Sequence, residues 1–170
     1  KPDTTGIPSD ITGEVPEWLQ SAQNLDQMVR ALREVAKASG SYYTSGQTPT
    51  SMGDVANATG ITFVDGNLET RQDGGGILVV TGKLTLNGAF NFNGLIIVTG
   101  AEGMDRKGGG NGLLQGATVV APYNPNNLSA GFLPPKYDMS GGGTSDIRYN
   151  SNSIANGMTA VGNFFLTVAE

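Results

Sequence analysis

Apolar residues in the centre of the chain come in short β-prone blocks, and a glycine separates each block from the next. Five glycines stand six residues apart between residues 76 and 100, and the segments between them read ILVVT, KLTLN, AFNFN and LIIVT. Glycine adopts positive φ at little cost, so a glycine at every sixth position lets the chain turn at each corner, while five β-prone residues span one flat side. A short fixed period of this kind predicts a parallel β-solenoid.

The six-residue repeat extends beyond this block on both sides. It begins with Gly60-ITFVD-Gly66 and resumes as Gly110-NGLLQ-Gly116-ATVVA, so we expect the solenoid to cover residues 60–122. Two interruptions, at 72–75 and 101–109, predict short corner loops. They favour a right-handed coil, although the repeat itself leaves the handedness open. Three repeats per coil predict a triangular cross-section. The first side should stack the segments 61–65, 77–81, 95–99 and 117–121. The second side should stack 67–71 and 83–87, and the third 89–93 and 111–115.

Residues at alternate positions of these strands should point into the solenoid. The inward set is apolar and comprises Leu78, Val80, Leu84, Leu86, Phe90, Phe92, Ile96 and Val98. The first side is unusual because its outward positions are apolar too, namely Ile61, Phe63, Ile77, Val79, Leu95, Ile97 and Val119. Strands that are apolar on both faces are usually covered on both, so another element should pack on this side.

One long helix is predicted ahead of the solenoid, over residues 17–39. Apolar residues recur there with the period of a helix face, at Leu25, Met28, Val29, Leu32, Val35 and Ala36, and Gly40 follows as a C-cap. We expect this helix to lie across the apolar side of the solenoid. Residues 1–16 are rich in Pro, Gly, Thr and Asp, which is typical of a linker or tail.

The chain after the solenoid, residues 123–170, is expected to form a loop and a C-terminal cap. A strand is predicted at 146–149, then a short helix capped by Ser151 or Ser153, and a final strand over 164–168. Repeat folds need such caps at their open ends. The predicted fold class is therefore mainly β: a short parallel β-helix in a single domain, 17–170, with a long N-terminal helix packed on one side and a C-terminal α/β cap.

The amino-acid composition excludes several kinds of partner and functional site. A net charge of -5 and a pI near 4.6 argue against nucleic acid and anionic membranes as partners. The absence of cysteine and histidine excludes disulfides, zinc sites built from Cys and His, and every Ser-His-Asp arrangement. No run in the sequence approaches the roughly 18–20 apolar residues that a membrane-spanning helix needs.

A polysaccharide-active enzyme built on a β-helix would need two or three carboxylates on one exposed side. The candidate carboxylates are Asp65, Glu69, Asp73 and Asp105, with the cations Arg71, Arg106 and Lys107 nearby. Turn positions and solvated charge runs explain these residues better than an active site does. We therefore expect no catalytic residue.

Three further patterns are weak signals of a binding site. A calcium site among Asp105, Asp138 and Asp146 would lack EF-hand spacing. The residues Tyr42, Tyr43 and Tyr123 would suit a sugar-stacking platform, but scattered tyrosines are normal on protein surfaces. The glycines at 108–110 are not followed by the Lys-Ser/Thr of a phosphate-binding loop. We expect neither a cofactor nor a metal.

The irregular loops are the expected interaction surfaces, because loops held by a rigid scaffold often carry function. Two of them qualify, 101–109 and 124–143. The candidate interaction residues in and beside these loops are Glu102, Asp105, Arg106, Lys107, Tyr123, Lys136 and Tyr137.

The segment GGGILVVTGKLTLNGAFNFNGLIIVTG, resumed at GNGLLQGATVVAPYN, together with DIRYNSNSIANGM near the end, resembles the C-terminal domain of PilX-type type IV pilus assembly proteins. The resemblance covers residues 60–170. It implies a non-catalytic, minor pilin-like ectodomain that acts in pilus biogenesis or adhesion, with other pilus or envelope proteins as partners. It also implies export to the periplasm or the cell surface, with membrane contact only through an N-terminal anchor that precedes Lys1.

Two alternatives stay open. Runs of Gly-x5-Gly with apolar strands also occur in bactofilins, which are scaffolds that polymerise end to end. The interruption at 101–109 and the polar tail after Pro122 fit an endless β-helix less well. The other alternative is the polysaccharide-active enzyme.

Overall fold

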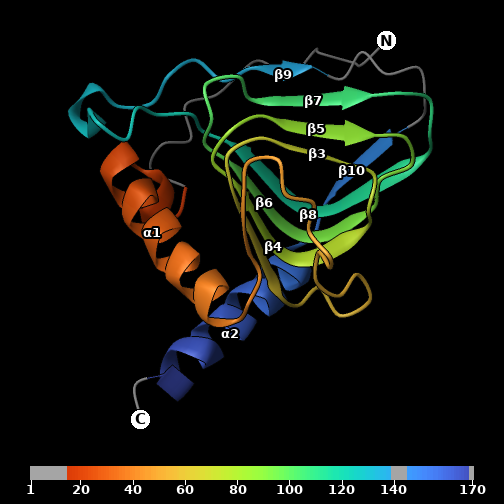
Figure 1. Cartoon of the computed structure of the whole chain (residues 1–170), viewed down its shortest axis with the longest axis horizontal. Helices are drawn as coiled ribbons and strands as arrows, with labels where there is room; N and C mark the ends of the chain where they lie inside the picture. Colours follow the sequence, from red (N-terminus) through yellow and green to blue (C-terminus); the bar gives the residue numbers. More distant parts are fainter. Residues whose placement is uncertain (1–14, 139–144, 169–170) are drawn as a thin grey trace.

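Two parallel sheets wind around one core (Figure 1). The computed structural model describes residues 15–138 and 145–168, except the side chains of 145 and 160–168. Within them the chain forms a mainly β solenoid of about four turns. The first sheet has the strand order β1-β2-β4-β6-β8-β10 and the second β3-β5-β7-β9, and every pairing is parallel. Most of the predicted linker, residues 1–14, lies outside the described residues.

The strands of the first sheet are β1 (Tyr42–Thr44), β2 (Ile61–Asp65), β4 (Gly74–Val80), β6 (Phe92–Val98), β8 (Gly112–Val120) and β10 (Ser145–Tyr149). Those of the second are β3 (Leu68–Thr70), β5 (Leu84–Asn87), β7 (Met104–Lys107) and β9 (Tyr137–Asp138). The α-helices are α1 (Ala22–Ala38) and α2 (Ser151–Val168), and two short 3-10 helices are η1 (Glu17–Leu19) and η2 (Leu128–Ala130).

Successive turns of the first sheet stay in register although their lengths differ. Ile61 pairs with Ile77, Ile77 with Leu95 and Leu95 with Ala117, which are steps of 16, 18 and 22 residues. The additional residues of the longer turns lie between the paired segments. The strands predicted for the first side of the solenoid are therefore confirmed.

The third predicted side is not a separate sheet. The strands β4, β6 and β8 each continue through a glycine, so the blocks before and after that glycine share one ladder. Gly76, Gly94 and Gly116 have φ angles of +84°, +143° and +132°. Such angles let a strand bend sharply, and pairing continues before the bend, with Phe92 opposite Leu114.

The predicted corner loop at 101–109 proved wrong in its centre, which is strand β7. Leu84 of β5 pairs there with Met104, and Asn87 with Lys107. Three of the four β7 residues are charged, which hides the apolar alternation that marks the other strands. The second sheet thus runs through this turn without a break.

The inward-pointing residues are as predicted. All eight are buried in one cluster inside the solenoid, where they are joined by Met52, Val64, Leu68, Met104 and Leu114. The outward residues of the first sheet form a second cluster with the helices. The alternation of the strands therefore produces two apolar layers, one on each face of the same sheet.

Helix α1 packs on the outward face of the first sheet, but it is shorter than the predicted span of 17–39. Leu25 and Leu32 lie in one buried cluster with Phe63 of β2. The Ser21 hydroxyl accepts a hydrogen bond from the Asn24 N–H at 3.1 Å, an N-cap that sets the start of the helix at the next residue. Glu17 therefore falls in η1 instead.

The predicted C-terminal cap is wrong in two respects. First, α2 does not close the end of the solenoid: it packs on the outward faces of β4, β6 and β8, beside α1 (Figure 1). Second, 164–168 is helical, so α2 is far longer than expected and takes up the segment predicted as the final strand. Its N-cap is Asn150, whose side-chain oxygen accepts from the N–H groups of Asn152 and Ser153. One helix is too narrow to cover the apolar face of this sheet, and α2 covers the remainder.

We predict that Leu32→Glu lowers the free energy of unfolding by about 3 kcal/mol or more, because it places a charge in the apolar layer under α1. Ala31→Glu is the matched control, since residue 31 is exposed on the same helix. Urea unfolding followed by circular dichroism gives both values. Equal stability of the two variants would show that α1 is not held by this layer.

We also predict that Gly94→Ala costs more than about 3 kcal/mol of stability. A Cβ at this position would lie 2.0 Å from the Gly76 carbonyl oxygen of the preceding turn. Gly88→Ala is the control, because Gly88 also has positive φ but no atom within 4 Å of its Cβ position, so it bears only the cost of the left-handed conformation, about 1–2 kcal/mol. Thermal melts of both proteins test the difference.

Candidate functional site

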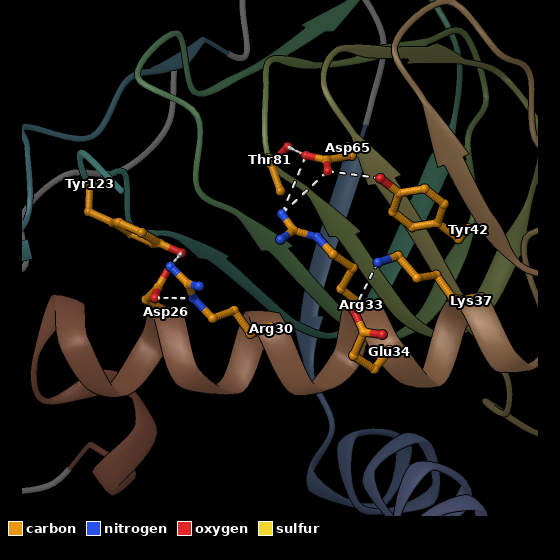
Figure 2. A network of polar contacts seen from close by, with 9 residues as sticks. All are labelled: Asp26, Arg30, Arg33, Glu34, Lys37, Tyr42, Asp65, Thr81 and Tyr123. Carbon is orange, nitrogen blue, oxygen red and sulfur yellow. Dashed lines mark hydrogen bonds and ion pairs between the residues drawn. The ribbon is translucent and has the colours of Figure 1, made fainter. Parts of the chain in front are cut away.

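A stripe of polar side chains runs along α1 beside its apolar face. Asp26, Arg30, Arg33 and Lys37 follow one another at steps of four, three and four residues, the spacing that keeps side chains on one side of a helix. Figure 2 shows that Arg30 leans toward Asp26 and Tyr123, whereas Arg33 extends toward Asp65. The stripe therefore makes two separate networks with the solenoid.

The first network centres on the buried side chain of Asp26, which is 6% exposed. The Asp26 carboxylate accepts two hydrogen bonds. Arg30 Nε donates one at 2.6 Å, and the Tyr123 hydroxyl donates the other at 3.2 Å. Burial, followed by the charge of Asp26 and the hydrogen bond to it, raises the pKa of Tyr123 well above its ordinary value. Tyr123 therefore stays a neutral donor that ties the chain after β8 to α1.

The second network centres on Asp65 at the end of β2. Its carboxylate accepts from the Thr81 hydroxyl at 2.8 Å and from the Tyr42 hydroxyl at 2.9 Å. Arg33 Nη2 is further away, at 3.4 Å, and the Arg33 guanidinium also lies over the Phe63 ring, 5.2 Å from its centroid. Asp65 thus joins α1, β1 and two turns of the solenoid.

The other candidate carboxylates also bond to a neighbouring turn. Glu69 accepts from the Asn87 amide at 2.7 Å. Asp73 accepts from both the backbone and the side chain of Asn91, at 2.7 and 3.0 Å. Asp105 is paired with Lys83 at 2.6 Å, and this contact raises the pKa of Lys83. The carboxylates therefore cross-link adjacent coils of the solenoid.

The structure brings the two predicted interaction loops together. Met104 in the first pairs with Tyr137 in the second, and Asp105 with Asp138, so both loops meet in the β7–β9 ladder. Glu102, Lys107 and Lys136 are exposed close to this ladder, and Tyr137 is 45% exposed. Tyr123 is not part of it, because it lies under α1.

Two of these residues differ from the prediction of an exposed loop. Arg106 is 4% exposed and points into the solenoid, where desolvation lowers the pKa of its guanidinium. Tyr123 is 7% exposed, so its ring is not available to stack on a sugar. Arg106 is buried because successive side chains of β7 point to opposite faces of the sheet, and the position of Arg106 beside Leu86 faces inward.

The residues of the weak calcium pattern divide between the two sheets. Asp105 and Asp138 are partners in the second sheet, but Asp146 lies on β10 of the first and is bound by Arg148 at 2.6 Å. Among the residues that the structure describes, no three Asp or Glu side chains form a group that fits a metal ion.

Sequence reasoning missed the helix side of the network. It singled out Asp65 and Tyr123 but none of Asp26, Arg30 and Arg33, since only the apolar face of the helix entered the argument. The signal was present in the spacing of these polar residues, which lie on the edge of that face.

Comparison with known proteins identifies no relative: no family model, no curated protein and no solved structure matches the chain. In the part of the chain that is described, neither helix combines the length and the apolarity needed to cross a membrane.

We predict that Tyr123→Phe lowers stability at neutral pH by about 1–2 kcal/mol, because Asp26 loses a buried hydrogen bond. The raised pKa means that the folded state favours the neutral phenol. Its contribution is therefore complete below the unfolded-state pKa of about 10 and declines as the pH rises above that value.

Chemical unfolding at pH 7 and at several values above pH 10 tests this linkage. The wild-type protein should lose stability more steeply than Tyr123→Phe over the alkaline range. Tyr149→Phe serves as the control, since Tyr149 is 79% exposed and its loss should leave the wild-type slope unchanged. Parallel curves for wild type and Tyr123→Phe would contradict the assignment.

Proposed function

We propose that this chain is a structural, non-catalytic module of the cell envelope, the exported domain of a type IV pilus assembly protein of the PilX kind. The proposal that the module is non-catalytic is supported by the structural bonds that the candidate carboxylates make. Asp65, Glu69, Asp73 and Asp105 are each bonded to a residue of an adjacent turn, namely Thr81, Asn87, Asn91 and Lys83, whereas the two carboxylates of a glycosidase are directed at one substrate. The pilus part rests on the sequence resemblance.

The contact surface of such a module is best placed at one end of the solenoid. Within the described residues, β9 and β10 are the last strands of the two sheets, and they carry three of the exposed large apolar side chains. Tyr137 is 45%, Ile147 48% and Tyr149 79% exposed. Exposed apolar groups at the end of a sheet suit association with another protein.

The test is made in the organism that carries the gene. Deletion should reduce piliation, twitching or adhesion, and the wild-type gene should restore them. Ile147→Asp should fail to restore them while the purified variant melts like wild type. Val55→Asp is the control, because Val55 is 37% exposed in a loop away from β9 and β10, and it should complement fully.

A deletion strain with unchanged pili, motility and adhesion would contradict the proposal. Electron microscopy of the purified protein separates it from the scaffold alternative. End-to-end filaments would favour a polymerising β-helix of the bactofilin kind, whereas a module of a pilus assembly should stay unpolymerised on its own.

A further inference from the structure

A small cavity lies between α1 and the turns of the solenoid, at the polar stripe of the helix. Its volume is about 230 Å³. It has both charged walls and hydroxyl groups, and its lining includes Asp26, Arg30, Arg33, Asp65, Thr99 and Tyr123. Pockets for drug-sized ligands start at roughly 300 Å³, so this one suits a single compact group.

The four charged side chains of this cavity are not equally well paired. Asp26 and Arg30 form a short ion pair of 2.6 Å, which Tyr123 completes. Asp65 has two neutral donors at 2.8 and 2.9 Å. Arg33 has only long contacts, from Nη2 to the two oxygens of Asp65 at 3.4 and 3.5 Å. The positive charge of Arg33 is thus the least compensated of the four.

The hydrogen-bonding capacity of Arg33 is also incompletely used. A guanidinium has five N–H donors, and Nε of Arg33 is buried with no hydrogen-bond partner among the residues that the structure describes. Phe63 contacts the guanidinium through its ring and offers no acceptor oxygen. A buried donor without a partner calls for an explanation, and a bound ion is one of the usual ones.

We propose that this cavity binds a compact oxyanion, a carboxylate or a sulfate group, through Arg33. A guanidinium donates only, so its ligand must supply acceptors, and planar or tetrahedral oxyanions match its fork with two parallel hydrogen bonds. Thr99 adds a hydroxyl to the lining. The ligand would share the Arg33 guanidinium with Asp65. The Asp65 carboxylate would lose little hydrogen bonding, because the hydroxyls of Tyr42 and Thr81 already donate to it.

This site is independent of the proposed pilus function and of the β9–β10 end. A ligand here would join α1 to the solenoid from within the cavity. Because it would bind the folded state only, it should raise the melting temperature as its concentration increases.

The test uses acetate and sulfate as probes on the purified chain, at constant ionic strength against chloride. The Nε–H signals of the arginine side chains are followed by NMR, and the spectrum of Arg33→Gln assigns the signal of Arg33. Saturable shifts of the Arg33 signal are expected with at least one probe, while Arg148, which is paired at 2.6 Å outside the cavity, stays unchanged. A preference for acetate or for sulfate tells a carboxylate site from a sulfate site.

Two variants keep the proposal falsifiable. Arg33→Gln should abolish the rise in melting temperature that the preferred probe produces in the wild-type protein. Thr99→Val retains Arg33 and should weaken binding several-fold, which covers the case in which Arg33→Gln folds poorly. The proposal fails if all arginine signals drift together without saturation, or if the melting temperature of Arg33→Gln responds to the probe as wild type does.

Discussion

The close approach of successive turns at the corners is the constraint on which the rest of this structure depends. Where the chain bends within β4, β6 and β8, a glycine of one turn lies directly over a glycine of the turn before. A Cβ on Gly94 would lie 2.0 Å from the Gly76 oxygen, and one on Gly116 would overlap the Gly94 oxygen in the same way. A second column behaves alike, with a Cβ on Gly100 meeting the Gly82 oxygen at 2.3 Å. In the turns that contain Gly76 and Gly94, two corners are therefore reserved for glycine, and the six-residue period is the distance between them.

This tight stacking determines what the other parts of the molecule must do. A sheet whose strands are this regular presents an apolar row on each face, and the interior of the solenoid fills only one of them. The outward row must be covered by another element, and α1 and α2 do so side by side. Polar side chains lie at the edge of this apolar layer, where α1 meets the solenoid. Asp65 stands there at the end of β2, and it bonds to the next turn and to β1 while Arg33 reaches it from α1.

The sequence was sufficient to predict those parts of the fold that follow from local periodicity. The spacing of the glycines and the alternation of residues such as Leu78 and Val79 identify the turns, the inward set and the apolar outer face. It was not sufficient where pairing with a neighbour decides the structure. Strand β7 reads MDRK and forms because β5 lies beside it. Likewise FFLTV at 164–168 has the composition of a strand but continues α2, since tertiary context overrides a weak local preference.

Two arginines show why burial alone does not identify a binding site. Arg106 is the more buried, and its Nη1 also lacks a partner among the described residues. Its guanidinium, however, lies against the backbone of Gly88 and at the position that a Cβ on Gly112 would occupy, so the solenoid itself fills the space around it. Its unpaired charge is a cost to stability. Arg33 differs in that its charge borders a cavity whose lining also includes residues with hydroxyl groups. An incompletely paired charge can select a ligand only where there is room for one, and of these two residues only Arg33 has that room.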